Sequence, residues 1–143
     1  MCFSSHTSAC SVLHVQNGLL AANNHAKKMR DMLQHNLQEG CPSARINGPR
    51  DDSCRLPGTL SIGFPGVVSG KVLLRIRDRV CCSAGSACHS FLAVSPVLKA
   101  IGIPLELAGG TLRLSTGKFT TPDDVRIASD VILSALSDNT CKV

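Results

Sequence analysis

The sequence predicts a single α+β domain in which helices cover one face of a small, mainly antiparallel sheet. Short segments with an apolar residue at every second position alternate with longer segments whose apolar residues recur every three or four positions. The chain has 143 residues, the length of one ordinary domain. Apolar residues make up 43% of it and aromatic residues 3%, so the core must consist mainly of Leu, Ile, Val and Ala. Short strands interleaved with helices are typical of the α+β class.

The first half of the chain contains one amphipathic helix and two strands. Residues 1–22 have a weak apolar pattern and are interpreted as an appendix or a broken helix. From Asn24 the apolar residues follow a helical period, with Asn23 or Asn24 as the cap and Gly40 and Pro42 at the end. The opposite, polar face of this helix is expected to carry Lys27, Lys28, Arg30 and Asp31. Strands are predicted over 44–48 and 59–64, separated by a loop at 51–53.

The residue pattern in the second half of the chain predicts three helices and two strands. Residues 67–76 and 95–102 are expected to be helical, and residues 79–84 and 111–115 to be strands, with a loop of small residues over 85–90. The last helix has the clearest start. Thr121 supplies a capping hydroxyl, Pro122 occupies the first helical position, and Asp124 stands three residues after the cap. We therefore interpret Asp123 and Asp124 as capping residues and not as a catalytic pair, and we assign the loop pair Asp51 and Asp52 a structural role as well.

Composition and charge exclude several classes of function. Charged residues are 17% of the chain and the net charge is +5, so the chain is neither disordered nor polybasic. Four Phe with no Trp or Tyr offer few platforms for stacking on bases, which argues against a nucleic-acid partner. The uncharged run 56–70 contains two prolines and predicts no membrane span. Residues 1–26 lack the Lys and Arg of an export signal, so we expect a cytoplasmic protein whose eight cysteines are mostly free.

Cys88 is the candidate nucleophile. It lies in S-A-G-S-A-C-H-S, where small upstream neighbours leave space around the sulfur and allow the loop to reach outward. A thiolate is a strong nucleophile when a positive charge or a base lies near it. His89 is adjacent in sequence, but sequence neighbours need not converge in space, and a buried, inert Cys88 is the alternative.

Arg113 is the candidate anion-binding residue. It stands in the middle of an otherwise apolar strand, where its guanidinium either faces solvent or binds an anion, a carboxylate suiting its two-pronged geometry best. A metal site built from Cys81, Cys82, Cys88 and His89 is disfavoured, because the C-C-x5-C-H spacing lacks the paired C-x2-C motif of zinc sites. We therefore expect no metal.

Four ordered segments resemble the C-terminal domain of selenocysteine lyases and cysteine desulfurases, which are pyridoxal-phosphate enzymes of the class V aminotransferase group. The segments are R-L-P-G-T-L-S-I (55–62), R-D-R-V-C-C-S-A-G-S-A-C-H-S (77–90), S-P-V-L-K-A-I-G (95–102) and T-L-R-L-S-T-G-K-F-T-T-P-D-D-V (111–125). The similarity covers residues 24–137, leaving 1–23 as an unmatched N-terminal segment and 138–143 as a tail. The C-H-S motif looks more like the selenocysteine lyase branch, since simple desulfurases often have C-T-S.

The resemblance implies a fold and roles for two residues. The fold is the small domain of fold-type I pyridoxal-phosphate enzymes. Cys88 matches the loop cysteine that receives sulfur or selenium as a persulfide or selenopersulfide, and Arg113 matches the arginine that binds the substrate carboxylate. The family reaction converts L-selenocysteine or L-cysteine to L-alanine.

The same resemblance implies that family members bind their cofactor in a large domain that carries a Schiff-base lysine. No segment of this sequence resembles that domain. We therefore expect this chain alone to bind no pyridoxal phosphate and to be inactive. The alternative is a non-catalytic module that accepts a persulfide or binds a partner. The expected partners are a large domain, a second copy in a homodimer, or a protein that accepts the sulfur or selenium.

Overall fold

The computed structural model describes residues 5–84 and 95–141, and within these the side chains of all residues except 5–17 and 139. Four longer elements carry the fold: α1 (Ser5–Gly40), β2 (Thr59–Gly63), β4 (Thr111–Ser115) and α5 (Pro122–Ser137). The shorter elements, in chain order, are β1 (Arg45–Ile46), η1 (Asp52–Cys54), α2 (Ser69–Ile76), β3 (Ser83–Ala84), α3 (Pro96–Ala100), α4 (Leu105–Ala108) and η2 (Asn139–Cys141).

The sheet has four strands in the order β1-β2-β4-β3, and every neighbouring pair is antiparallel. Its centre is the pairing of β2 with β4, which runs from Thr59 opposite Ser115 to Gly63 opposite Thr111. Both strands alternate as predicted, since Leu60, Ile62, Leu112 and Leu114 are buried on one face. The α+β class and the antiparallel sheet are confirmed.

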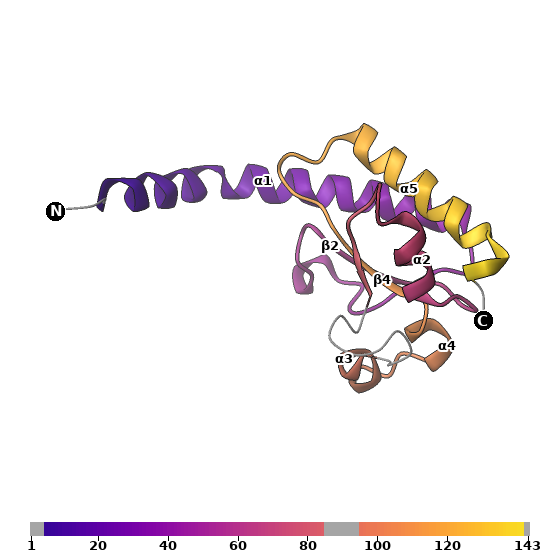
Figure 1. Ribbon diagram of the computed structural model, residues 1–143. Coiled ribbons are helices and arrows are strands. Elements are labelled where there is room, and N and C mark those ends of the chain that lie inside the picture. The colour runs from indigo at the N-terminus through magenta and orange to yellow at the C-terminus, as the bar shows by residue number, and fades with distance from the viewer. Residues whose placement is uncertain (1–4, 85–94, 142–143) are drawn as a thin grey trace.

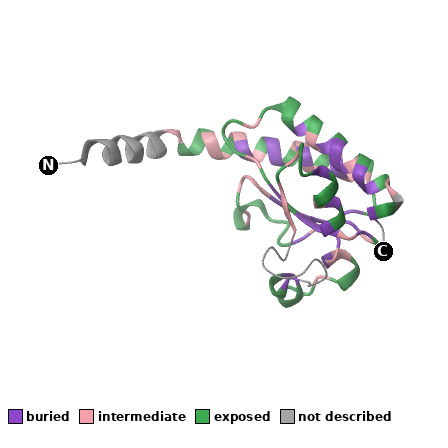
Figure 2. Ribbon diagram, viewed as in Figure 1, coloured by how far each residue is buried: buried purple, intermediate pink, exposed green. Residues whose placement is uncertain are grey.

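Three helices cover this buried face. α1, α2 and α5 share one apolar cluster with the sheet (Figures 1 and 2). Met29 and Leu33 enter it from α1, Val72 from α2, and Val125 and Ile132 from α5. The opposite face of the sheet is more polar and contains Ser61, Arg113 and Ser115. The fold therefore presents one polar face of its sheet away from the three longer helices.

Two expectations about α1 are wrong. The helix does not begin at Asn24 but is continuous from Ser5 to Gly40, and its N-terminal part projects beyond the rest of the molecule (Figure 1). Asn23 and Asn24 therefore lie inside the helix and do not cap it. Arg30 does not lie on a polar face either, since its side chain is 1% exposed and bonds to two aspartates. The predicted end at Gly40 is confirmed.

Most of the other elements match the predictions in kind; β4 has its predicted bounds, and several others are shorter than predicted. α5 begins with the expected capping box, in which Thr121 and Asp124 each accept a backbone N–H of the other residue. The strand predicted over 79–84 is reduced to Ser83–Ala84. The loop at 51–53 contains the turn η1, capped by the Asp51 carboxylate, and the short helix α4 was not predicted. The helices formed by described residues include none with the length and apolarity that a membrane crossing requires.

Candidate functional site

Arg113 occupies the polar face of the sheet, in the middle of β4. It lies opposite Ser61 of β2 on one side and opposite Ser83 of β3 on the other, so the three residues form one row across the sheet. The side chain is exposed, while its neighbours Leu112 and Leu114 point into the core. Among the described residues no carboxylate pairs with this guanidinium, in contrast to Arg30 and Arg75. Its donors are therefore available to an external anion.

A hydrogen-bonded chain of polar side chains fixes the surroundings of Arg113. The buried Asn47 amide donates to Ser61 Oγ at 3.2 Å and to Thr111 Oγ1 at 3.1 Å. Thr111 Oγ1 in turn donates to the Leu107 carbonyl at 2.8 Å. These bonds connect Asn47 to Ser61, which lies opposite Arg113 on β2, and to Thr111, two residues before Arg113 on β4. Asn47 was not singled out in the sequence, where it is one more polar residue before a turn glycine.

Cys88 and His89 lie in 85–94, outside the described residues, and their roles remain predictions. The structure does fix where this segment starts. β3 ends at Ala84, which lies opposite Leu112, the residue before Arg113. Cys88 is the fourth residue after Ala84 in the sequence, so the chain leads into the Cys88 motif from the strand beside Arg113.

Cys81 and Cys82 are free thiols in different environments. Cys81 is exposed, whereas Cys82 is half-buried against the core. Burial, and secondarily the negative charge of a neighbouring Cys81 thiolate, raise the pKa of Cys82 to about 11. Within the described parts of the chain, no three His, Cys, Asp or Glu residues are grouped as a metal site would require.

The paired aspartates have the structural functions that were expected. Backbone and side-chain hydrogen bonds from Thr121 hold the pKa of Asp124 below its usual value. Asp52 accepts hydrogen bonds from Lys27 and Arg30, which lower the pKa of its carboxyl group.

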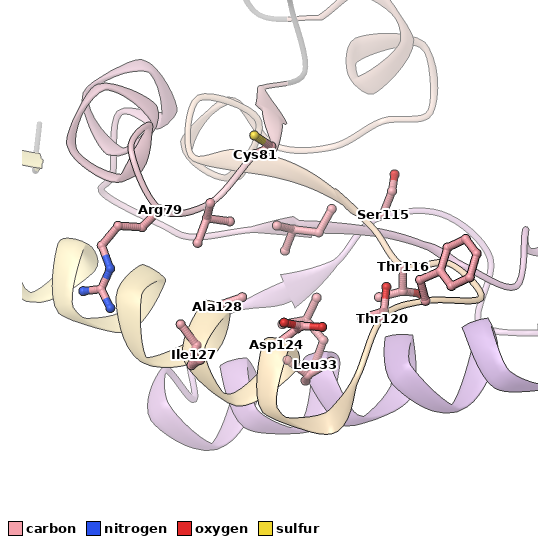
Figure 3. Close-up of a pocket in the computed structure, with 13 residues that line it drawn as sticks. Leu33, Arg79, Cys81, Ser115, Thr116, Thr120, Asp124, Ile127 and Ala128 are labelled. Atoms are coloured by element: carbon pink, nitrogen blue, oxygen red, sulfur yellow. The ribbon is translucent and has the colours of Figure 1, made fainter.

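A pocket of about 410 Å³ lies on the helix-covered side of the sheet, beside the segment that precedes β3 (Figure 3). Leu33, Leu114 and Val125 form its apolar floor, and Arg79, Cys81 and Asp124 are polar residues of its wall. Arg113 is not among the residues that line it. Arg113 therefore lies outside this pocket, although Ser115, two residues after it on β4, is one of the lining residues.

The described residues do not fit a pyridoxal-phosphate site. Such a site needs a lysine that forms an imine with the cofactor in an enclosed space. Lys27 is paired with Asp52 at 2.9 Å, and the ammonium group of Lys118 lies 4.6 Å from the Phe119 ring centre. No lysine lines the 410 Å³ pocket or the 560 Å³ pocket between α2 and α5.

No family model matches the sequence. Among proteins of known function, the chain is 35% identical over 113 residues to a protein named cysteine desulfurase IscS from Rickettsia typhi, covering 78% of this chain and 27% of that protein. It is 36% identical over 112 residues to a protein of the same name from Clostridium botulinum, covering 77% of this chain and 28% of that protein.

Solved structures show the same relationship. A NifS-like protein superposes with a TM-score of 0.68 at 26% identity, covering 85% of this chain and 29% of that chain. A NifS-like protein from Rickettsia africae gives a TM-score of 0.70 at 20% identity, which shows the shared fold. This chain thus spans a little over a quarter of the length of the relatives it matches.

Proposed function

Since the homologues of this chain are cysteine desulfurases of the IscS and NifS-like kind, we propose that it is the small C-terminal domain of such an enzyme or of a selenocysteine lyase. It would supply the side of the active site that binds the substrate carboxylate and receives the sulfur or selenium. The observation that carries this proposal is the position of Arg113, exposed and without a carboxylate partner among the described residues, next to the strand that leads to Cys88.

Arg113 would bind the carboxylate of L-cysteine or L-selenocysteine. Its planar guanidinium can donate two parallel hydrogen bonds to one carboxylate. Asn47 and Ser61 fix the neighbouring strand, so the guanidinium is presented from a rigid sheet. Rigid support matters, because an arginine whose strand moves would hold the substrate loosely.

Cys88 would accept the sulfur or selenium. His89, its neighbour in the sequence, is the candidate residue for influencing the protonation of the Cys88 thiol. In transfer from a persulfide donor, the Cys88 thiolate attacks the outer sulfur, the S–S bond of the donor breaks, and the donor leaves as a thiolate. The result is a persulfide on Cys88, with no net oxidation or reduction. A reducing compartment such as the cytoplasm suits this chemistry, and Cys41, Cys54, Cys81, Cys82 and Cys141 are all free thiols.

We propose residues 24–137 as the domain unit, with 1–23 as an added segment and 138–143 as a tail. Hydrogen bonds to the rest of the molecule at His25 and Ala26 support the first boundary. The described part of the tail packs on the domain, since the Val68 N–H donates to the Cys141 carbonyl at 3.0 Å.

The chain alone would not convert L-cysteine or L-selenocysteine to L-alanine. Purified chain incubated with pyridoxal phosphate and either substrate should release no alanine and show no imine absorption band. Addition of a separately produced large domain from an IscS relative should restore alanine release, and Arg113→Ala should abolish that gain while Arg126→Ala leaves it intact. Alanine release by the chain alone would contradict the proposal.

If the chain instead works as a non-catalytic acceptor of persulfides or as a binding module, the large domain will restore nothing. A full-length desulfurase should then still bind the chain, and binding should survive Cys88→Ala.

A further inference from the structure

Two serines flank Arg113 on the polar face of the sheet, and their hydrogen bonding differs. Ser61 of β2 and Ser83 of β3 both lie opposite Arg113. Residues directly opposite each other on antiparallel strands have their Cβ atoms about 5 Å apart, so both hydroxyl groups lie beside the base of the arginine side chain. Within the described chain, the Ser61 hydroxyl is bonded to Asn47, whereas the Ser83 hydroxyl has no partner.

The hydrogen bonds around Asn47 all run in one direction. Thr111 Oγ1 gives its only proton to the Leu107 carbonyl at 2.8 Å, so in its contact with Asn47 it can only accept. The atom of the Asn47 side chain that faces it must therefore be the amide nitrogen, which has two protons. One proton goes to Thr111 Oγ1 at 3.1 Å and the other to Ser61 Oγ at 3.2 Å.

This direction leaves the Ser61 hydroxyl as a donor. Its oxygen accepts from Asn47, and a hydroxyl that accepts at its oxygen still has one proton to give. No described residue accepts that proton. Asn47 is 8% exposed and closes the inner side of Ser61, while Ser61 itself is half-buried and borders the exposed Arg113. The Ser61 proton is therefore free to point toward the polar face of the sheet.

The Arg113 guanidinium can share a ligand with this proton at one of its edges. An arginine donates two parallel hydrogen bonds to a carboxylate either from its two terminal nitrogens or from Nε and one terminal nitrogen. The edge that includes Nε is nearer to the backbone, so a carboxylate bound there lies lower over the sheet. A serine hydroxyl extends only one bond beyond Cβ, and it can reach an anion at the Nε edge but not one at the tip.

We propose that Ser61, oriented by Asn47, donates a third hydrogen bond to the carboxylate that Arg113 binds through its Nε edge. Ser61 touches the substrate, and Asn47 is a positioning residue that acts through Ser61. The inference rests on the proposed role of Arg113, and it adds the edge of the guanidinium that is used and a second residue that recognises the carboxylate. A carboxylate accepts from all three donors, whereas a neutral amide of the same shape presents N–H groups to some of them, so the site selects the charged group.

Titration of the full chain with acetate tests this proposal on the chain alone. The NMR signal of the Arg113 Nε–H, assigned by its loss in Arg113→Lys, should shift as acetate is added at constant ionic strength, and acetamide should not shift it. Ser61→Ala should weaken acetate binding about tenfold, since it removes one hydrogen bond to a charged group. Ser61→Thr retains a hydroxyl in a strand and should bind acetate as the wild type does. Ser134→Ala, at an exposed serine of α5, is the matched control and should leave binding unchanged.

The role of Asn47 is tested in two backgrounds. Asn47→Ala releases the Ser61 hydroxyl to rotate, so it should weaken acetate binding severalfold, by less than Ser61→Ala does. In a chain that already carries Ser61→Ala, the same substitution should have no further effect on acetate binding, because Asn47 acts through the serine hydroxyl. An equal loss in both backgrounds would show that Asn47 only supports the sheet and would overturn its positioning role.

The outcomes separate this inference from the proposed function. An Arg113 signal that acetate does not shift in the wild type, or equal acetate affinities of the wild type and Ser61→Ala, would overturn the inference. The proposed function is tested separately, by alanine release after addition of a large domain, and a large domain that restores nothing leaves the acetate result in force. Where alanine release is restored, Ser61→Ala should raise the KM for L-cysteine about tenfold and change kcat by no more than about twofold. An unchanged KM would count against the role of Ser61 and not against the proposed function.

Discussion

Arg30 is a charged side chain held almost entirely inside the molecule. Its guanidinium donates to Asp31 at 2.6 Å, to Asp52 at 2.8 Å and to the Leu56 carbonyl at 3.4 Å. Asp52 also pairs with Lys27 at 2.9 Å, so this cluster fastens η1 and the loop after it to the side of α1. A buried guanidinium costs free energy unless its donors are satisfied, and here the two aspartates satisfy them.

Replacement of Arg30 should therefore destabilise the fold. We expect Arg30→Met to lower the free energy of unfolding by about 2 kcal/mol, less than for a fully buried ion pair because both aspartates remain about half exposed. Urea denaturation of the wild type and the variant measures this change in the free energy of unfolding. Arg126→Met is the control, since the Arg126–Asp123 pair is exposed and should change stability by no more than about 0.5 kcal/mol. Equal effects of the two substitutions would contradict the structural account of Arg30.

The adjacent thiols should differ in reactivity. With a pKa of about 11, Cys82 is a thiolate in only about one molecule in a thousand at pH 8, and it is half-buried as well. We expect iodoacetamide to modify the exposed Cys81 well before Cys82 in the folded chain. Mass spectrometry of the peptides after timed quenching measures both rates, and equal rates for the two thiols in the folded chain would contradict this expectation.

The sequence predicts some residues better than others. Alternation predicts the side of the sheet that Arg113 occupies, because its neighbours Leu112 and Leu114 have to face the core. The burial of Arg30 could not be predicted in this way, since it depends on Asp52, which is 22 residues away in the sequence and approaches only after folding. Asn47 was missed for the same reason, because its partner Thr111 is 64 residues away.

At the scale of the elements, the start of α5 depends on the capping box. The Thr121 hydroxyl accepts from the Asp124 N–H at 3.1 Å, and the Asp124 carboxylate accepts from the Thr121 N–H at 2.9 Å. We expect Thr121→Ala to lower the free energy of unfolding by about 1 kcal/mol. Thermal unfolding at pH 7 measures it, and an unchanged midpoint would show that the cap does not hold this helix.

The Asp124 carboxylate of this capping box should make the stability of the fold depend on pH. The pKa of Asp124 is lower in the folded state, so its carboxylate stabilises the fold above the unfolded pKa of about 4 and loses this effect as the pH falls through the folded pKa. Asp124→Asn should therefore be less stable than the wild type at pH 7, and the difference should shrink below about pH 4. A difference that persists unchanged at acid pH would contradict the role of the carboxylate.

The junction before β4 requires glycine at one position. A Cβ at Gly110 would collide with the Phe64 carbonyl oxygen and approach the Val67 carbonyl oxygen to 3.0 Å. Because both are backbone atoms, Gly110→Ala should cost about 2 kcal/mol of stability. Gly117→Ala is the control, since nothing lies within 4 Å of a Cβ there. If both glycines tolerate alanine equally, the close approach of the two segments does not exist in solution.

Elements with strong local signals could be predicted, and those set by their neighbours could not. β4 matches its predicted range residue for residue and α5 begins at the predicted cap, because alternation and the capping box are local features. β3 is shorter than predicted because Val80 and Cys82 pack against the core instead of extending the strand pairing beyond Ser83. The length of α1 was missed because residues 1–22 lack the opposing charged face by which the later part was recognised.

At the scale of the whole molecule, the two faces of the sheet differ in what they carry. One face is closed by α1, α2 and α5 and holds the chain together, while the other presents Arg113 from a polar surface. The resemblance of four ordered motifs predicted both the fold and the kinship with cysteine desulfurases, and the comparisons confirm both. The role of Cys88 stays a prediction, since the residue lies outside the described chain.

Transfer of labelled sulfur to the chain tests the central claim most directly. An active cysteine desulfurase charged with [³⁵S]cysteine should be mixed with the full chain, and the labelled residue identified by peptide mapping without reduction. The account predicts label on Cys88, loss of that label in Cys88→Ala, and unchanged labelling in Cys81→Ala. Label on Cys81 that persists in Cys88→Ala, or no transfer from a donor that labels its usual acceptor, would contradict it.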